Sequence, residues 1–413
     1  MKRIVYHVDV NSAYLSWEAA YRLLQGDALD LRTVPSAVGG DPLTRRGIVL
    51  AKSIPAGRYG VRTGESLMEA LKKCPSLHIV RPHFSLYRRC SAALKEELES
   101  WSPRVETFSI DESFMDMSHA ADPILTAHQL KDNISKKLGF TVNIGVSSNK
   151  LLAKMASDFQ KPDRVHSLFP EEIPKKMWPL PVRKLFMVGA RSEQKLHSMG
   201  IHTIGDIAEA DPQLLYQRMK SHGILLSNYA RGIESSDLRH YSPFDAKGIG
   251  NSTTLPRDID QRSDLRLYLL AISEMVSSRL RAIGRLASVI HVHYRSSLFH
   301  KQGHQRKLPS GIDQTMHIFE CACELFEEIW KKEPIRQIGI RLSDFSDSNC
   351  FQPEIFRPQR AEAERRLDRT IDELRERFGD DAISRASFLH TSIPHIIGGV
   401  GEERYDLTLR SQL

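Results

Sequence analysis

The chain has 413 residues, of which 41% are hydrophobic and 26% charged, a composition typical of a globular protein with two to four domains. No apolar run approaches the roughly 20 residues of a membrane-spanning helix, and the N-terminus shows no signal-peptide pattern. We therefore expect a cytoplasmic protein without a membrane segment. The five cysteines include no second Cys or His pair at metal-ligand spacing, which argues against a zinc site.

Strands and helices alternate over about the first 165 residues, which predicts an α/β region. The expected elements are a strand at 4–10, a helix from about 12, a strand at 47–51, helices at 66–73 and 86–101, two strands within 105–117, a strand at 142–146 and a helix at 150–158. From about 170 to 234 the pattern changes to short helices separated by turns, which predicts a small all-helical unit.

An α+β unit is expected from Lys247 onward, with strands at 289–294 and 338–342 and long helices near 262–283 and 313–331. The strand at 289–294 alternates: Ile290, Val292 and Tyr294 lie on one face, and the basic residues His291, His293 and Arg295 lie on the other. A last helix is predicted in the tail, ended by Gly379, with an apolar stripe of four residues. These are Leu367, Ile371, Leu374 and Phe378.

Three carboxylates stand where predicted strands end. Asp9 closes the first strand, and Asp111 and Glu112 lie between two later strands. Neighbouring residues on a straight strand point to opposite faces, so Asp111 and Glu112 can act together only at a strand end or hairpin tip. Converging carboxylates repel one another and favour a cation such as magnesium. The alternative is that these acids are helix caps or solvated surface residues.

Three segments resemble the Y-family translesion DNA polymerases, closest to the bacterial DNA polymerase IV type. They are residues 7–14, 108–116 and 149–162, which occur in this order and at the family's spacing. The second contains the central Ser-Ile-Asp-Glu sequence. The resemblance covers roughly residues 1–345. It implies a right-hand architecture with palm, small fingers, helical thumb and a little-finger domain.

The resemblance places the domains as follows: palm 1–20 and 80–168, fingers 21–79, thumb 169–236, little finger 246–345 and a C-terminal tail 346–413. By position, Asp9, Asp111 and Glu112 match the family's catalytic carboxylates, which hold two Mg²⁺ ions with the carbonyl of Val10 as a further ligand. Lys161 matches the lysine that reaches the incoming triphosphate, a task that suits a flexible point charge.

Tyr14 lies where the family has its aromatic steric gate, a ring that leaves no room for a ribose 2′-hydroxyl. The alternative is a tyrosine that packs in the first helix. The fingers depart from the family, because Ile54 and Gly57 occupy the places of an aromatic residue and an arginine that touch the triphosphate. Arg58 is the candidate to replace the missing charge. In the thumb hairpin only Gly189 matches clearly, since Met187 stands at the first glycine position.

The net charge is +7, and its uneven distribution along the chain indicates where a polyanion could bind. Between Arg279 and Lys307 there are seven Lys or Arg residues and no acid, and two further arginines lie at 336 and 341. Arg295, Arg336 and Arg341 are the candidates for a strand face against duplex DNA, with Gly189 contacting the backbone from the thumb. A solvated basic face is the alternative.

The tail holds Gln352-Pro353-Glu354-Ile355-Phe356, which resembles the peptide by which bacterial polymerases bind the sliding clamp. Gln352, Ile355 and Phe356 are its expected contact residues.

The sequence therefore predicts a low-fidelity, template-dependent DNA polymerase that takes primer-template DNA and deoxynucleoside triphosphates and acts as a monomer. Two alternatives are a nucleotide cyclase on a similar palm, and a DNA-binding accessory protein that has lost catalysis. The presence of all three carboxylates and Lys161 argues against the accessory protein.

Overall fold

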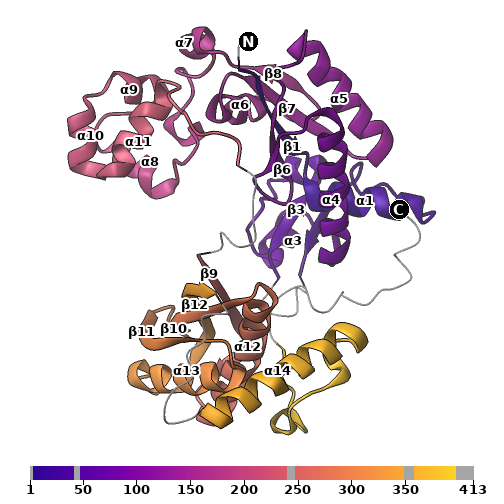
Figure 1. The fold of residues 1–413 in the computed structure, drawn as a ribbon. Coiled ribbons are helices and arrows are strands. Elements are labelled where there is room, and N and C mark those ends of the chain that lie inside the picture. Colours follow the sequence, from indigo (N-terminus) through magenta and orange to yellow (C-terminus); the bar gives the residue numbers. More distant parts are fainter. Residues whose placement is uncertain (1–2, 41–46, 240–246, 348–357, 397–413) are drawn as a thin grey trace. The chain divides into compact units, whose positions relative to one another are not determined.

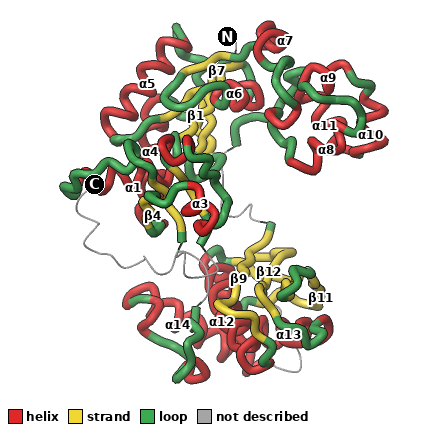
Figure 2. Tube along the Cα trace, turned by 180° about the vertical axis from the view of Figure 1, so that it is seen from behind, coloured by secondary structure: helices red, strands yellow, loops and turns green. Residues whose placement is uncertain are grey.

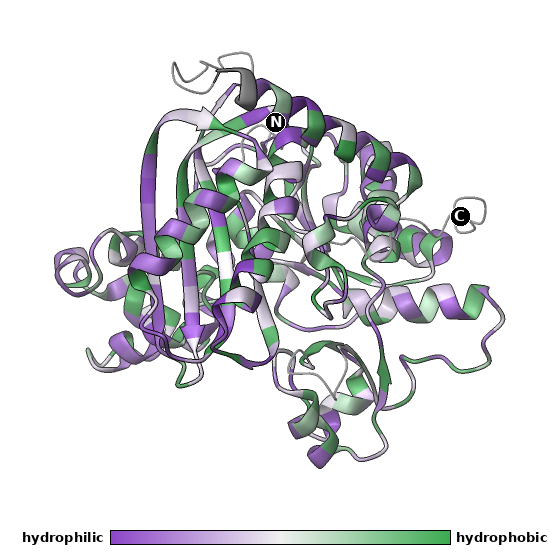
Figure 3. Ribbon diagram, turned by 90° about the horizontal axis from the view of Figure 1, so that it is seen from below, coloured by the Kyte–Doolittle hydropathy of each residue, from purple (hydrophilic) through white to green (hydrophobic). Residues whose placement is uncertain are grey.

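The computed structural model describes residues 3–40, 47–239, 247–347 and 358–396. These residues form two compact units, the first from 3–40 and 48–239 and the second from 247–347 with 358–396. Hydrophilic and hydrophobic residues are banded along single helices and strands in Figure 3, as expected where one face of each element is buried. None of the helices in the described ranges is both long and apolar enough to span a membrane.

A five-stranded sheet lies at the centre of the first unit, in the order β5-β6-β1-β7-β8. Its strands are β1 (Val5–Val10), β5 (Val105–Thr107), β6 (Glu112–Asp116), β7 (Val142–Ser147) and β8 (Val165–Ser167). The central strand β1 runs antiparallel to both β6 and β7. Because side chains alternate along a strand, Tyr6, Val8 and Val10 enter the main hydrophobic core, and His7 and Asp9 face the opposite side.

Helices cover both faces of this sheet, and Figure 1 shows α5 and α6 on opposite sides of its strands. The main core is closed by α1 (Ala13–Leu24), α4 (Phe84–Trp101) and α5 (Pro123–Leu138). On the other face, α6 (Lys150–Ser157) packs directly on β1 and β7. A Cβ on Gly145 would overlap the carbonyl oxygen of Ala153, so only glycine at this position of β7 permits the close approach of α6.

A small three-stranded sheet, in the order β3-β2-β4, forms the region expected to be the fingers. It contains β2 (Ser36–Gly39), β3 (Val49–Lys52) and β4 (His78–Val80), flanked by α2 (Ile54–Arg58) and α3 (Leu67–Lys73). The sequence predicted β3 and α3 but not β2 or β4. Those two strands have only four and three residues, too few for a clear period-two pattern.

The helical unit predicted at 170–234 is confirmed, and Figure 2 shows that this segment contains helices and loops but little else. Its α-helices are α7 (Ile173–Lys176), α8 (Ala190–His197), α9 (Ile204–Glu209), α10 (Pro212–Met219) and α11 (Ser221–Ala230). They share a hydrophobic core, which includes Leu196, Ile207, Leu215 and Leu226 and extends to residues of α6 such as Leu152 and Met155.

The second unit has a four-stranded antiparallel sheet in the order β11-β10-β12-β9. Its elements are β9 (Gly248–Ile259), α12 (Arg262–Ala282), β10 (Arg285–Ser296), β11 (Lys301–Ile312), α13 (Thr315–Ile329) and β12 (Ile335–Asp347). The predicted alternation of β10 is confirmed: Ile290, Val292 and Tyr294 are buried in the core shared with α12 and α13.

The tail helix is confirmed as α14 (Pro358–Phe378), but the predicted apolar stripe is not its buried face. Of the four apolar residues only Ile371 is buried; Leu367, Leu374 and Phe378 are exposed. The helix instead packs through charged residues in a network of buried ion pairs. These pairs are Arg281 with Asp368 and Asp372, Asp313 with Arg365, and Glu274 with Arg375 and Arg385.

Candidate active site

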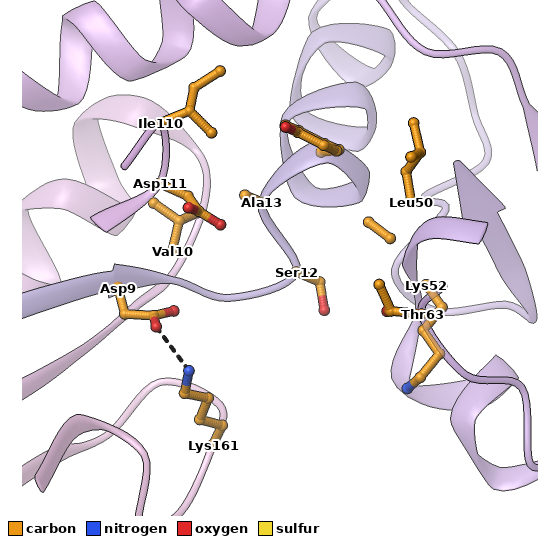
Figure 4. A pocket seen from close by; sticks show the side chains of 12 residues that line it. Asp9, Val10, Ser12, Ala13, Leu50, Lys52, Thr63, Ile110, Asp111 and Lys161 are labelled. Atoms are coloured by element: carbon orange, nitrogen blue, oxygen red, sulfur yellow. Dashed lines mark hydrogen bonds and ion pairs between the residues drawn. The ribbon is translucent and has the colours of Figure 1, made fainter. Parts of the chain in front are cut away.

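A cavity of about 360 Å³ opens where β1 leads into α1 (Figure 4). The sheet and α1 supply one side of it, and the fingers strand β3 supplies another. It is lined by Asp9, Val10, Ser12, Ala13, Tyr14, Leu50, Ala51, Lys52, Thr63, Ile110, Asp111 and Lys161. Four of the sequence-predicted site residues therefore meet in one cavity with Val10: Asp9, Asp111, Tyr14 and Lys161.

The sheet register brings the predicted carboxylates together. Asp9 on β1 pairs with Glu112 on β6, so their side chains lie on the same face of adjacent strands. Asp111 precedes the first residue of β6 and is therefore free of the alternation that would point it away from Glu112. The backbone N–H of Val10 donates to the carbonyl oxygen of Asp111 (3.0 Å), which fastens this strand end to β1. The strand-end placement predicted from the sequence is confirmed.

Two lysines neutralise this carboxylate group. Lys161 Nζ lies 2.9 Å from Asp9 Oδ2, and Lys154 Nζ lies 2.8 Å from Glu112 Oε1. Burial raises the pKa of Asp9 to about 7, Lys161 opposes this rise and Glu112 adds to it. Burial would also raise the pKa of Glu112, but the nearby His7 and the hydrogen-bonded ammonium group of Lys154 outweigh it and hold that pKa well below its usual value.

His7 is a site residue that the sequence reasoning missed. Its ring is fully buried, and Nδ1 is hydrogen-bonded to Ser157 Oγ at 2.8 Å. The other ring nitrogen, Nε2, lies 3.8 Å from Glu112 Oε2. Burial lowers the pKa of His7, which favours the neutral ring. The only available signal was its position on the same strand face as Asp9, two residues earlier.

Two buried asparagines hold the loop that carries Lys161. The side-chain amide of Asn143 donates to the carbonyl oxygens of Ser157 and Gln160. Asn11 Oδ1 accepts a hydrogen bond from the backbone N–H of Asp163 (2.9 Å). Because residues on both sides of Lys161 are fixed to β7 and to the end of β1, its ammonium group is delivered to Asp9 from a rigid base.

Tyr14 stands at the second position of α1 with its ring held from behind. It stacks on Tyr87 at a centroid distance of 4.6 Å and an interplanar angle of 14°. Phe84 meets it edge-on at 6.1 Å. The ring both packs in this aromatic cluster and lines the cavity, so the two readings of Tyr14 from the sequence are compatible.

The fingers contribute a different cation from the one the sequence suggested. Arg58 is exposed at the end of α2 and is not among the described residues that line the cavity. Lys52, the last residue of β3, does line it. The alternation of β3 held the missed signal: Val49 and Ala51 are buried, whereas Leu50 and Lys52 are the partly exposed residues.

The thumb hairpin keeps a glycine-like conformation without the glycine. Met187 has a φ of 72°, in the left-handed region that glycine usually occupies. Gly189 is the N-cap residue of α8. Arg183 donates a hydrogen bond to the carbonyl oxygen of Val188 (2.8 Å), which closes the turn. A phosphate contact at Gly189 stays a prediction.

The basic residues predicted to form one face of the second unit fall into two groups: some lie on the outer face of the sheet, and others are held in ion pairs. In the sheet register His291 pairs with Arg341 and Arg295 pairs with Lys301, which places Arg295, Lys301 and Arg341 on the face away from the core. Arg336 lies at the register shift between Ile335 and Gln337, binds Asp258 at 3.1 Å and lies over the ring of Phe299. Arg281 and Arg306 are likewise engaged, by Asp368 and Asp372 and by acids of α13, respectively.

The predicted clamp-binding residues Gln352, Ile355 and Phe356 lie outside the described residues.

Comparisons with known proteins agree with this arrangement. Residues 8–158 match the impB/mucB/samB family, residues 246–355 match that family's C-terminal domain, and residues 170–201 match its HHH motif. The DNA polymerase IV of Clostridium acetobutylicum is 41% identical over 392 residues, covering 94% of this chain and 99% of that protein. The DNA polymerase IV of Moorella thermoacetica is 37% identical over 367 residues, covering 87% and 91%.

A solved Y-family DNA polymerase chimera shares the fold, with a TM-score of 0.72 and 23% identity over 83% of this chain and 98% of that one. The expected right-hand fold with palm, fingers, thumb and little-finger domains is thereby confirmed, while the exact domain boundaries stay predictions. The chain belongs to the impB/mucB/samB family and is a DNA-directed DNA polymerase of the Y family.

Proposed function

We propose that the protein performs low-fidelity translesion synthesis, adding deoxynucleotides to a primer 3′ end with the help of two Mg²⁺ ions. The observation that carries the proposal is that Asp9 pairs with Glu112 on adjacent strands, while Asp9 and Asp111 line one cavity together with Lys161 and Tyr14. This is the arrangement that phosphoryl transfer requires, since its catalysis rests on positioning and charge neutralisation.

The donor set fits magnesium. Asp9, Asp111 and Glu112 would hold the ions through carboxylate oxygens, with the carbonyl of Val10 as a further ligand. Burial raises the pKa of Asp9 to about 7 and the neighbouring Glu112 adds to the rise, so a cation beside these two carboxylates would be favoured. In the described ranges no three acidic, His or Cys side chains form a ready-made metal cluster. Bound magnesium would activate the primer hydroxyl and neutralise the leaving pyrophosphate.

Lys161 acts as an exchangeable counterion in this proposal. In the structure it bridges Asp9 and Asp158, at 2.9 and 2.8 Å. When its ammonium group turns to the triphosphate of an incoming nucleotide, Asp9 becomes available as a metal ligand. The N-terminus of α1 opens on the same cavity through Ser12 and Ala13, and the partial positive charge of a helix N-terminus favours phosphate there.

Low fidelity is proposed from the small size of the fingers. Their sheet has strands of four, four and three residues, and they contribute only Leu50, Ala51, Lys52 and Thr63 to the described cavity lining. A wall of this size makes few contacts with a nascent base pair and so discriminates weakly against damaged templates. Primer-template DNA and deoxynucleoside triphosphates are the proposed substrates, a monomer the proposed state and the sliding clamp a proposed partner.

Primer extension with Mg²⁺ tests the proposal. The parent protein should extend a primer, Asp9→Ala should not, and both should bind primer-template alike. Glu99→Ala, which removes an exposed carboxylate of α4, is the matched control and should extend normally. Nucleotide consumption without DNA would favour the cyclase, and DNA binding without extension by the parent would favour the accessory protein. Normal turnover by Asp9→Ala would overturn the site.

A further inference from the structure

Lys52 is the one charged residue that the fingers add to the described lining of the cavity. Lys52 is the last residue of β3 and lies on the partly exposed strand face with Leu50; Leu50 and Ala51 line the cavity beside it. Figure 4 shows Lys52 on the fingers side and Lys161 beneath Asp9 on the other side. No carboxylate of the described residues forms an ion pair with Lys52.

Ser53 fixes the backbone from which Lys52 projects. Its hydroxyl donates to the carbonyl oxygen of Val34 (2.8 Å) and accepts from the backbone N–H groups of Ser36 and Ala56. The same side chain therefore ties the end of β3 to the start of β2 and caps α2. Lys52 is a flexible side chain on a rigid base.

Gly57 leaves the space that the Lys52 ammonium group occupies. A Cβ on Gly57 would lie 2.6 Å from Lys52 Nζ, closer than a carbon and a nitrogen can approach. Gly57 does not have a positive φ, so its backbone conformation does not require glycine. A glycine inside a short helix lowers the helix propensity. What Gly57 contributes in the structure is the space for the ammonium group of Lys52.

We propose that Lys52 binds the phosphates of the incoming deoxynucleoside triphosphate, and that Gly57 supports this role by leaving space for the ammonium group of Lys52. Family resemblance places a phosphate-binding arginine at position 57; here the cation comes from position 52, and its ammonium group lies in the space that a side chain at position 57 would fill. The inference rests on the proposed polymerase function. An ammonium group that forms no ion pair with the described carboxylates, across the cavity from Asp9, favours an anionic group of the ligand such as a phosphate.

Single-nucleotide incorporation of dCTP opposite a template guanine tests the role of Lys52. Lys52→Met keeps the aliphatic stem and should raise KM for dCTP by roughly ten-fold or more, the effect of losing one hydrogen bond to a charged group. The turnover number at saturating dCTP and the Kd for primer-template should change little. The inhibition constant of pyrophosphate should rise in parallel, since the same phosphates are bound. Lys72→Met, which removes an exposed charge of α3, should change none of these.

A double-mutant cycle tests the role of Gly57. Gly57→Ala should raise KM for dCTP several-fold in the parent by displacing the ammonium of Lys52, and should have little effect in Lys52→Met. Equal effects in both backgrounds would mean that Gly57 acts through α2 and not through Lys52.

The proposed function and this inference fail in different ways. If the parent extends primers and Lys52→Met has an unchanged KM and pyrophosphate inhibition, the assignment of Lys52 is wrong and the polymerase function stands. If the parent fails to extend primers at all, the proposed function itself is wrong. Equal melting temperatures of Lys52→Met and the parent exclude a folding defect as the source of a raised KM.

Discussion

Lys161 donates a hydrogen bond to Asp9, with 2.9 Å between Nζ and Oδ2, although 152 positions separate the two residues in the chain. Lys154 forms an equivalent ion pair with Glu112, so each of these two carboxylates has a lysine beside it. The two lysines therefore balance negative charge at the place where substrate and metal ions are proposed to bind. The electrostatics of this site give rise to the first prediction.

Asp9 is expected to cost stability when no metal is bound. Burial raises its pKa to about 7, so the folded state keeps the proton over a range where the unfolded state has lost it. An acid with a raised folded pKa loses stability as pH rises from about 4 to 7. Asp9→Asn should therefore raise the melting temperature of the metal-free protein more at pH 8 than at pH 5. The gain at pH 8 is about 4 kcal/mol at most.

Added Mg²⁺ is the control for this prediction. It should raise the melting temperature of the parent at pH 8 and leave Asp9→Asn nearly unchanged, because the variant lacks a ligand. An Asp9→Asn protein that melts below the parent at pH 8 would show that the carboxylate stabilises the fold.

The second prediction concerns sugar selection by Tyr14. Tyr14→Ala should raise the use of ribonucleotides relative to deoxynucleotides by at least an order of magnitude, without a comparable loss of deoxynucleotide use, because it removes a steric block and no charge. Tyr87→Leu removes the ring that stacks behind Tyr14 and should give a smaller change of the same sign. The measurement is the ratio of kcat/KM for the two sugars. An unaltered ratio in Tyr14→Ala would make Tyr14 a packing residue only.

A third prediction separates three arginines of the second unit by salt dependence. Arg295 and Arg341 lie on the outer sheet face, so each change to Ala should flatten the slope of log affinity against log salt by up to about 0.9 for duplex DNA. Arg336→Ala should leave that slope alone and lower the melting temperature, because Asp258 loses its ion pair with Arg336 and Phe299 loses the cation over its ring. A flattened slope for Arg336→Ala with no thermal effect would restore it to the DNA-binding face.

The fourth prediction tests the clamp peptide, which rests on sequence alone. Ile355→Ala/Phe356→Ala should abolish stimulation of extension by the sliding clamp. Burial of each side chain in a partner contributes roughly 1.5–3 kcal/mol, so the pair accounts for most of a short peptide's affinity. Extension without the clamp and the melting temperature should both match the parent. Early melting of the double variant would place these side chains in the protein's own core instead.

The chain order of its motifs, together with local periodicity, was enough to predict much of this protein. Asp9, Asp111 and Glu112 were placed at strand ends because an apolar run that stops at a carboxylate is a local signal. The alternation of β10 was read correctly for the same reason, since side-chain direction on a strand depends only on adjacent residues.

Only the tertiary structure decided which distant residues meet. It put Lys52 over Gly57 and left Arg58 outside, because the fold of β3 and α2 sets which side chain reaches the cavity. It also overrode the apolar periodicity of α14. Buried charges at Glu274, Arg281 and Asp313 cost more when unpaired than an apolar stripe gains by burial, so the helix docks through its charged face. Periodicity records a residue's neighbours along the chain, and no local pattern carries the partner of a charge a hundred residues away.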